Sequence, residues 1–417
     1  MLLFYRILIN LTFIFSPLII IIRLLKKKEH PTRFKEKFCF NTKKKVKGKL
    51  IWFHGASVGE ILSIIPLIER LEKNKKIKQI LITSNTLSSS RVLSGLKLRK
   101  TVHQFFPIDT DYHTKKFLNY WDPSIAFFVD SEIWPNMVTK IKKKSIPLVL
   151  INGRITKKSF KKWKIFSSNA KKIFQKFDLC LTSDSRSLKY LKLLGAKNIK
   201  FIGNLKFTES EKNTGFLNTD LIKFFLSKKI WCASSTHNIE EIICANVHSK
   251  LKAKYKNLLT IIIPRHIHRT QEILDQIKKL NLKVYLHDSK FKINEDTDIY
   301  LVNSFGQTKS FFKICKTVFL GGSLIKHGGQ NPIEAARFGC NIIHGPNIWN
   351  FEEIYNLLKK HKVSNNVINH NQLTNKVDKM LNNTNKNKNK NLELKIKNLG
   401  NKILTSTLSQ INFYINK

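Results

Sequence analysis

The stretch LIWFHGASVGE (residues 50–60) decides the fold. Its first five residues are almost all apolar, which is typical of a β-strand covered on both faces in a parallel sheet. Two glycines then permit a tight turn, and the apolar spacing of residues 61–71 predicts a helix. Five similar strand-like runs follow with helical patterns between them, so we expect alternating β and α elements. These runs are residues 77–83, 125–129, 146–151, 179–182 and 199–202.

A polar stretch at residues 207–219 interrupts the alternation and is interpreted as a linker. The alternation then resumes, so two successive doubly wound α/β units are the simplest account of the 417 residues. Ligands of such units bind at the carboxyl ends of the strands, which predicts two Rossmann-like lobes facing a cleft. An Asn/Lys-rich stretch at residues 382–391 is expected to be a mobile loop before a last helix. The second set of strand-like runs comprises residues 230–233, 259–263, 284–287, 299–302, 318–320 and 342–344.

The N-terminal segment differs from the rest of the chain. Residues 2–25 are nearly all apolar, and roughly 20 such residues are needed to cross a bilayer core. Lys26, Lys27 and Lys28 follow at once, and the positive-inside rule places them on the cytoplasmic side. The rival interpretation, a cleaved signal peptide, lacks a small-x-small cleavage site after the apolar run. We therefore predict a membrane-anchor helix at 1–28, a first lobe at 29–208 and a second lobe at 209–417.

The charge of the chain limits the classes of binding partner, and its cysteine content indicates the redox state of its compartment. The chain carries 75 Lys and Arg against 28 Asp and Glu, a net charge of +47. One interpretation is attraction to anionic lipid or a phosphorylated substrate, and the other is compositional drift toward Lys, Asn and Ile. No nucleic-acid-binding motif occurs, so we expect no nucleic-acid partner. The six cysteines lack C-x-x-C spacing, which argues against zinc and disulfides and favours a reducing compartment.

Three side chains at predicted strand ends in the first lobe are candidates for chemistry. Glu60 follows the first strand, and a carboxylate at that place can act as a general base. Ser57 lies three residues before it, so the pair also fits a capping box, and the pattern alone does not separate the two interpretations. Glu132 is either a second functional carboxylate or an acid placed in a first helical turn. Lys206 could stabilise a developing phosphate charge or be one more solvated lysine.

The second lobe has glycine-rich turns after its predicted strands. Gly321-Gly322-Ser323 follows one strand, and the segment 328–334 leads into a helix with Pro332 near its start. Such turns at a helix N-terminus form an anion cradle, although two ordinary tight turns would give the same pattern. Neither the dinucleotide G-x-G-x-x-G nor a Walker A motif is present. A nucleotide sugar is the favoured ligand.

Two Asp-x-Asp pairs are present, and such pairs can hold a divalent ion against a nucleotide diphosphate. Asp109/Asp111 and Asp296/Asp298 both lie in polar loop contexts, away from the glycine-rich turns. No H-x-x-x-H pairing occurs either. We therefore expect no metal.

Six motifs follow one another from the anchor to the second lobe and cover most of the chain. They are WFHGASVGE (52–60), DSEIWPN (130–136), INGRITKKS (151–159), GNLKF (203–207), IPRHIHR (263–269) and GGSLIKHGGQNPIEAARFG (321–339). Each alone is weak, whereas six in the same order are specific. Together they resemble one family, the 3-deoxy-D-manno-octulosonic acid (Kdo) transferases.

The resemblance implies a GT-B glycosyltransferase at the cytoplasmic face of the bacterial inner membrane. It implies transfer of Kdo from CMP-Kdo to the lipid A precursor (lipid IVA), with inversion at the anomeric carbon, in lipopolysaccharide biosynthesis. The first lobe would take the acceptor and the second CMP-Kdo. Glu60 would be the base, with Glu132 and Lys206 assisting the transition state. The residues that correspond to CMP contacts are Pro264, Arg265, Phe305, Gly306, Gln307, Asn331, Pro332, Ile333 and Glu334.

The chain departs from the family pattern at two positions. The family usually has Gly-Glu where this chain has Gly306-Gln307, which removes one carboxylate near the nucleotide. It usually has Gly-Gly-His-Asn where this chain has Gly-Gly-Gln330-Asn. The first departure motivates an alternative function, a catalytically inactive, membrane-tethered protein that binds a nucleotide sugar.

Overall fold

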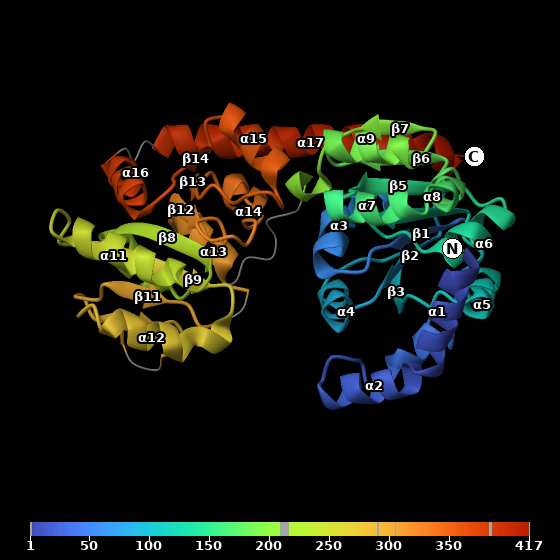
Figure 1. Ribbon diagram of the computed structural model, residues 1–417, viewed down its shortest axis with the longest axis horizontal. Helices are drawn as coiled ribbons and strands as arrows, with labels where there is room; N and C mark the ends of the chain where they lie inside the picture. The colour runs from blue at the N-terminus through green and yellow to red at the C-terminus, as the bar shows by residue number, and fades with distance from the viewer. Residues whose placement is uncertain (1, 209–216, 290–291, 305, 383–385, 417) are drawn as a thin grey trace. The chain divides into compact units, whose positions relative to one another are not determined.

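The computed structural model describes residues 2–208, 217–289, 292–304, 306–382 and 386–416. The chain divides into two compact units, Met1–Glu209 with Gly400–Lys417 and Ser210–Leu399. Each unit is an α/β structure built on a seven-stranded sheet whose neighbouring strands are all parallel (Figure 1). The predicted α/β class with two Rossmann-like units is therefore confirmed.

The first sheet has the strand order β3-β2-β1-β4-β5-β6-β7. Successive strands run outward from β1 in one direction and then from β4 in the other, so the order reverses between β1 and β4. Ligands of open parallel sheets bind at such a switch point, beyond the carboxyl ends of the strands. The strands are β1 (Leu50–His54), β2 (Gln79–Ser84), β3 (Thr101–Phe105), β4 (Ile125–Val129), β5 (Leu148–Gly153), β6 (Leu179–Thr182) and β7 (Ile199–Phe201).

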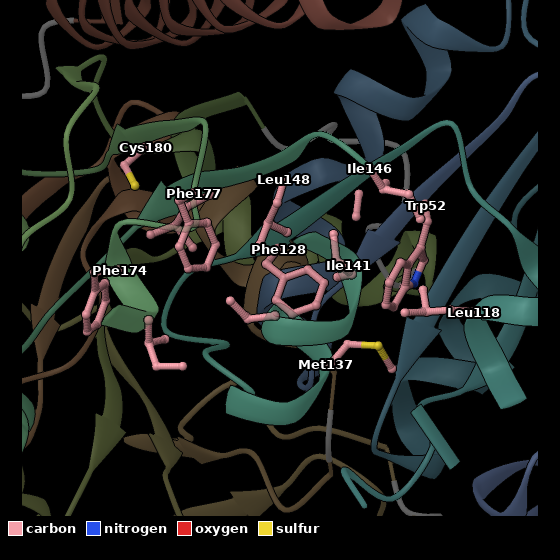
Figure 2. Close-up of a cluster of buried hydrophobic side chains, with 14 of the residues drawn as sticks. Trp52, Leu118, Phe128, Met137, Ile141, Ile146, Leu148, Phe174, Phe177 and Cys180 are labelled. Carbon is pink, nitrogen blue, oxygen red and sulfur yellow. The ribbon is translucent and has the colours of Figure 1, made fainter. Parts of the chain in front are cut away.

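The central strands are buried because their side chains are apolar on both faces. Every residue of β1, β2, β4, β5 and β6 is buried. One face packs against helices through large side chains such as Trp52, Phe128 and Phe174. Figure 2 shows this cluster. The labelled residues are Trp52, Leu118, Phe128, Met137, Ile141, Ile146, Leu148, Phe174, Phe177 and Cys180.

The helices of the first unit follow the strands in turn, and most begin at a polar cap. Thr86, Thr110, Thr156 and Asp184 each accept a hydrogen bond from the backbone three residues later, as N-cap residues do. A 3₁₀ turn, η2 (Leu205–Thr208), follows β7. The helices are α3 (Val58–Leu71), α4 (Leu87–Ser94), α5 (Asp111–Trp121), α6 (Pro135–Lys143), α7 (Lys157–Ile165), α8 (Ser167–Phe174) and α9 (Ser185–Leu193).

The C-terminal segment differs from the prediction, which assigned all of 209–417 to the second lobe. The segment from Gly400 onward, part of α17 (Lys386–Asn416), belongs to the first unit. A Cβ at Gly400 would lie 2.3 Å from the Phe207 carbonyl oxygen, so this close approach requires glycine. Tyr414 donates to the Asp178 carbonyl at 3.1 Å, and Ile411 is buried. Packing against distant residues therefore decides where this segment lies.

The N-terminus forms two helices rather than the single predicted anchor helix. These are α1 (Leu2–Ile14) and α2 (Ser16–Leu25), bent by 52° at the break. Pro17 in the first turn of α2 explains the break, since proline is favoured at a helix start and lacks the N–H needed further in. Among the described residues no single helix is long and apolar enough to cross a membrane, although the bent pair together meets that criterion.

Helix α1 is fastened to the body of the first unit (Figure 1). The Tyr5 hydroxyl donates to Asp109 Oδ2 at 2.6 Å, and Arg6 Nε donates to Asn136 Oδ1 at 3.1 Å. The Phe13 ring lies 4.9 Å from that of His113, centroid to centroid. These contacts place α1 against α5 and the start of α6.

The second sheet has the order β10-β11-β9-β8-β12-β13-β14, with a switch point between β8 and β12. Helix α11 packs on β8 and β9, and α16 packs on β8, β12 and β13. The strands are β8 (Lys229–Thr236), β9 (Leu258–Pro264), β10 (Val284–Leu286), β11 (Ile299–Leu301), β12 (Thr317–Leu320), β13 (Asn341–His344) and β14 (Ser364–Asn366). The helices are α10 (Thr219–Ser227), α11 (Glu240–Lys252), α12 (Thr270–Lys278), α13 (Thr308–Ile314), α14 (Ile333–Arg337), α15 (Glu352–Lys360) and α16 (His370–Asn382).

The two polar stretches have different outcomes. Most of the predicted linker, residues 209–216, lies outside the described residues. The predicted loop at 382–391 is wrong for residues 386–391, which form the start of α17, while 383–385 lie outside the described residues. Lysine has a good helix propensity, so a polar Asn/Lys segment can continue as a helix.

Candidate active site

Glu60 lies in the first turn of α3, immediately beyond the carboxyl end of β1. Its carboxylate accepts hydrogen bonds from the Ala56 backbone N–H at 2.6 Å and from the Ser57 hydroxyl at 2.9 Å. The Ser57 side chain accepts in turn from the Glu60 backbone N–H, so the predicted capping box is present. The carboxylate therefore has a structural role, which leaves open whether it also has a chemical one.

The pKa of Glu60 shows whether its carboxylate can also act as a general base. Burial raises the pKa of Glu60 to about 7, with smaller contributions in the same direction from the charges of Glu132 and Asp130. The hydrogen bonds from Ser57 and Ala56 oppose this shift and do not cancel it. A carboxylate with a pKa near 7 can take a proton at neutral pH and is a stronger base than an ordinary one. The capping acid thus also meets the requirement for a general base.

Glu132 follows β4, the strand next to β1. Its Oε2 lies 3.2 Å from His54 Nε2 and accepts from Trp134 Nε1 at 2.8 Å. Burial would raise the pKa of Glu132, but the hydrogen bonds from His54 and Trp134 outweigh it and leave the pKa below its ordinary value. Glu132 is therefore ionised at neutral pH, beside a Glu60 whose pKa is near neutrality.

His54 is a buried residue of this site to which we assigned no role from the sequence. Its ring is stacked on Phe106 at 3.8 Å between centroids, and its Nδ1 lies 3.0 Å from Thr83 Oγ1. In the neutral form of the ring, a proton on Nε2 is donated to the Glu132 carboxylate and Nδ1 accepts from the Thr83 hydroxyl. Trp52 Nε1 donates to the same hydroxyl at 2.9 Å. A chain of buried donors therefore holds Glu132 in its ionised form.

Lys206 lies in η2, after the last strand of the sheet, and η2 packs against α3. Its Nζ is 3.8 Å from Asp130 Oδ2, and its side chain is only 21% exposed. The interpretation of Lys206 as a solvated surface lysine is therefore wrong. Asp130 is a further residue to which we assigned no role, although its position one residue beyond β4 was a signal for it.

The first unit thus gathers acidic and basic groups at one sheet edge. Glu60 follows β1, Glu132 follows β4, and the order of strands reverses between these two. Lys206 reaches the same edge through its ion pair with Asp130, which also follows β4. A poised base, an ionised carboxylate and an ammonium group can together remove a proton and stabilise charges of both signs.

The predicted nucleotide contacts lie in the second unit, at the carboxyl ends of its strands. Pro264 is the last residue of β9, and the exposed Arg265 follows it with its N–H donating to the Thr236 carbonyl at 2.9 Å. Gly306 has φ +85°, which favours glycine, and Gln307 is the N-cap residue of α13. Phe305 lies outside the described residues.

The remaining predicted contacts surround the start of α14. Pro332 and Ile333 are buried, and Asn331 Oδ1 accepts from the Ile333 N–H at 3.2 Å. Glu334 is partly exposed, and its Oε1 lies 3.5 Å from Lys309 Nζ on α13. The structure therefore brings Asn331, Pro332, Ile333 and Glu334 together in one turn beside α13.

The first glycine-rich turn is not an empty anion cradle. The fully buried Glu240 carboxylate accepts from the N–H groups of Gly322 at 2.6 Å, Ser323 at 3.1 Å and Leu324 at 3.0 Å. It also accepts from His237 N–H at 3.1 Å. Burial outweighs these bonds, so the pKa of Glu240 lies above its ordinary value. For residues 321–324 the alternative interpretation, a structural turn, is therefore the one that applies.

Three further side chains converge beside that turn. A Cβ at Gly322 would lie 3.3 Å from His237 Cδ2, 3.3 Å from His327 Nδ1 and 3.4 Å from Gln330 Nε2. Gln330 Nε2 is 3.1 Å from His237 Nε2, so the glutamine that departs from the family pattern makes a polar contact of its own. Burial, and then the neighbouring His327, lower the pKa of His237 to about 4, so this imidazole is neutral at pH 7.

The Asp-x-Asp pairs are used structurally. Asp109 accepts from the N–H groups of Asn136 and Met137 at the start of α6, and Asp111 pairs with Lys140 at 2.7 Å. Asp298 is buried and bonds to Lys252 and to His248, the latter at 3.3 Å, and Asp296 pairs with Lys283. The described residues contain no group of three or more His, Cys, Asp or Glu side chains arranged to hold a metal ion. All six cysteines are buried free thiols.

Comparison with known proteins places this geometry in a family. Residues 32–209 match the model of the 3-deoxy-D-manno-octulosonic-acid transferase family (kdotransferase). A 3-deoxy-D-manno-octulosonic acid transferase of Rickettsia bellii is 32% identical over 381 residues, which are 90% of either chain. A probable mitochondrial 3-deoxy-D-manno-octulosonic acid transferase of Arabidopsis thaliana is 31% identical over 369 residues, 85% of this chain and 83% of that one.

A solved structure supports the fold independently. A putative UDP-N-acetylglucosamine 2-epimerase from Listeria monocytogenes aligns over 88% of this chain and 97% of its own, with a TM-score of 0.61 at 10% identity. Such a likeness at low identity shows the GT-B-like fold alone. Together with the two relatives and the six motifs at their strand ends, it leads to one assignment: the chain belongs to the 3-deoxy-D-manno-octulosonic acid (Kdo) transferases.

Proposed function

We propose that this chain transfers Kdo from CMP-Kdo to the lipid A precursor, with inversion at the anomeric carbon. The first unit takes the acceptor and the second takes CMP-Kdo. The observation that carries the proposal is Glu60, a half-buried carboxylate with a pKa of about 7 beside the ionised Glu132. A base of this strength is what an acceptor hydroxyl needs at neutral pH.

In the proposed reaction, Glu60 removes the proton from the acceptor hydroxyl as its oxygen attacks the anomeric carbon of Kdo. The bond between that carbon and the CMP phosphate oxygen breaks, and its electron pair leaves with the phosphate. Positive charge develops at the anomeric carbon, where the Glu132 carboxylate stabilises it. Negative charge develops on the leaving phosphate, and the ammonium of Lys206 stabilises that charge. The protons and charges balance without a metal ion.

For the donor we propose the contacts that the family motifs indicate. Arg265 supplies a fixed positive charge at the end of β9, and the turn at 331–334 supplies polar groups beside α13. Pro264, Phe305, Gly306 and Gln307 complete the set. In the first glycine-rich turn the Gly322, Ser323 and Leu324 amides donate to Glu240, so side chains carry most of the recognition of the phosphate.

We propose that the bent pair α1–α2 holds the chain at the cytoplasmic face of the bacterial inner membrane. Large apolar side chains of the pair are exposed from Leu3 to Leu25, including Leu11, Leu18 and Ile22. Arg23 at the end of α2 and the following lysines suit the anionic headgroup region. A lipid acceptor would be met at the same surface.

The experiment that tests the function is one in vitro reaction. The purified full-length chain is incubated in excess chelator with CMP-Kdo and lipid IVA, and the products are measured by mass spectrometry. We expect one or more Kdo additions to the lipid and an equal amount of released CMP. Binding of CMP-Kdo without turnover would support the alternative, an inactive nucleotide-sugar-binding protein. A strict need for a divalent metal would contradict the metal-free mechanism.

A further inference from the structure

Two neighbouring strands of the first sheet end in an unusual backbone conformation. Asp130, which follows β4, has φ +56°, and Asn152, the penultimate residue of β5, has φ +55°. Residues other than glycine rarely adopt this left-handed conformation, and Asp and Asn tolerate it better than most. Such local strain is retained where the surrounding structure requires it, often beside a functional site.

Hydrogen bonds tie both residues to the turn that carries Lys206. Asn152 Nδ2 donates to Asp130 Oδ1 at 2.7 Å, and Asn152 Oδ1 accepts from the Leu205 backbone N–H at 2.9 Å. The other oxygen of Asp130, Oδ2, lies 3.8 Å from Lys206 Nζ. The Asn152 amide is therefore a bridge between the buried Asp130 carboxylate and the backbone of η2. The same carboxylate faces the ammonium group of Lys206, the second residue of that turn.

The arrangement constrains Lys206 at both ends of its side chain. Its backbone is fixed through the Leu205 N–H and through its own N–H, which donates to Asn204 Oδ1 at 3.0 Å. Its Nζ is attracted by a carboxylate that cannot turn away, because Asn152 holds the other oxygen. A lysine side chain loses much of its rotamer entropy when it is ordered, so a lysine that is ordered beforehand lowers the barrier of the reaction.

We propose that Asp130 and Asn152 are positioning residues that aim Lys206 at the leaving phosphate of the donor. This inference rests on the proposed function, in which Lys206 stabilises the charge on that phosphate. Asp130 and Asn152 do not touch the substrate in this scheme. They act through Lys206, and their left-handed backbone conformations allow the side-chain contacts with η2 and Lys206.

The charges around the network give the test a second readout. Burial contributes most to the raised pKa of Glu60, followed by the negative charge of Glu132 and then by that of Asp130. Burial raises the pKa of Asp130 above its ordinary value. The charges of Lys206 and Arg154 and the hydrogen bond from Asn152 act against this rise, and the charge of Glu132 adds to it. Removing the Asp130 charge therefore lowers the pKa of Glu60. Because the base must be deprotonated, the acid limb of kcat/KM moves to lower pH.

The test is a double-mutant cycle of Asp130→Asn and Lys206→Ala with CMP-Kdo and lipid IVA. Asparagine keeps the left-handed backbone and still accepts from Asn152, so only the charge toward Lys206 is lost. We expect kcat to fall about tenfold in Asp130→Asn and about a hundredfold in Lys206→Ala, with little change in KM for CMP-Kdo. In the Lys206→Ala background, Asp130→Asn should lower kcat by less than about twofold, because the residue through which it acts is gone. Fully additive losses would overturn the proposal.

Asn152→Gly provides an independent variant, since glycine keeps the backbone and removes only the amide bridge. We expect kcat to fall while the acid limb stays in place, because the Asp130 charge remains. Unchanged kcat in this variant would overturn the role of Asn152. Asp178→Asn is the matched control, because it also removes a carboxylate that pairs with a lysine, Lys142, at 2.8 Å. Asp178 lies just before β6, at the amino ends of the strands and so at the opposite side of the sheet from Lys206. A wild-type chain without turnover would refute the proposed function itself, which separates the two failures.

Discussion

Ser57→Ala separates the structural role of Glu60 from its chemical role. The Ser57 side chain accepts from the Glu60 backbone N–H as a helix cap and donates to the Glu60 carboxylate at 2.9 Å. Loss of the cap should lower the free energy of unfolding by about 1 kcal/mol. Loss of the donated hydrogen bond removes a contact that favours the charged carboxylate, so the pKa of Glu60 must rise.

The size of that rise follows from the contacts that remain. Ala56 N–H still donates at 2.6 Å, so one of the two shortest bonds to the carboxylate is lost. A hydrogen bond to a charged group contributes about 1.5 kcal/mol at the low end, which corresponds to roughly one pKa unit. The pKa of Glu60 then moves from about 7 to roughly 8. At pH 7 the deprotonated fraction falls from about a half to about a tenth, so kcat/KM falls about fivefold.

The assay is kcat/KM measured from about pH 6 to about pH 9. Near pH 9 Glu60 is mostly deprotonated in both proteins, so the kcat/KM values of variant and wild type should converge there. Thr86→Ala is the matched control, because Thr86 caps α4 by accepting from Ser89 N–H at 3.2 Å, and its hydroxyl lies 2.6 Å from the Ser89 hydroxyl rather than against a carboxylate. It should lose similar stability and keep the wild-type pH profile. A Ser57→Ala profile that is lowered equally at every pH would refute the reasoning.

Three further outcomes follow from other parts of the structure. Asp109→Ala should lower the free energy of unfolding by about 2 kcal/mol in urea titrations, since it leaves buried N–H groups of α6 unsatisfied. Glu240→Ala should weaken CMP binding at least tenfold by calorimetry, because the Gly322–Leu324 turn loses its acceptor; wild-type affinity would show that this turn does not shape the donor site. Leu18→Asp with Ile22→Asp should reduce co-sedimentation with anionic phospholipid vesicles, whereas Leu193→Asp, at a more exposed apolar site on α9, should not.

The central strands were predictable because a strand that is buried on both faces has a continuous run of apolar residues. β1, β4 and β6 have the predicted bounds. The strands β3 and β14 were missed, and both are edge strands with polar residues, such as His103 and the segment 364–366. An edge strand is buried less and needs no continuous apolar run.

Long-range packing explains the other differences. Nothing local to Gly400 indicates that it lies against the Phe207 carbonyl, so the place of the C-terminal segment had no sequence signal. The break between α1 and α2 did have one, Pro17, which favours a new helix start over a single anchor helix.

The candidate site was predictable in position and only partly in character. Parallel strands end at one edge, so residues just beyond β1 and β4 had to be neighbours. The pKa of Glu60 depends on burial and on the charges of Glu132 and Asp130, which a pattern does not contain. The same holds for Asn152 and Glu240, whose partners are distant along the chain. A capping acid and a base were alternatives in the sequence, and in the structure one carboxylate satisfies the requirements of both.

The most direct test of Glu60 as the base is a single-turnover measurement of Kdo transfer by Glu60→Gln. Glutamine still accepts from the Ala56 N–H, so the helix cap and the fold should survive, while the amide cannot take a proton. We predict a rate of transfer at least about a thousandfold below wild type, with CMP affinity unchanged within about threefold. Transfer within about tenfold of wild type would contradict the account.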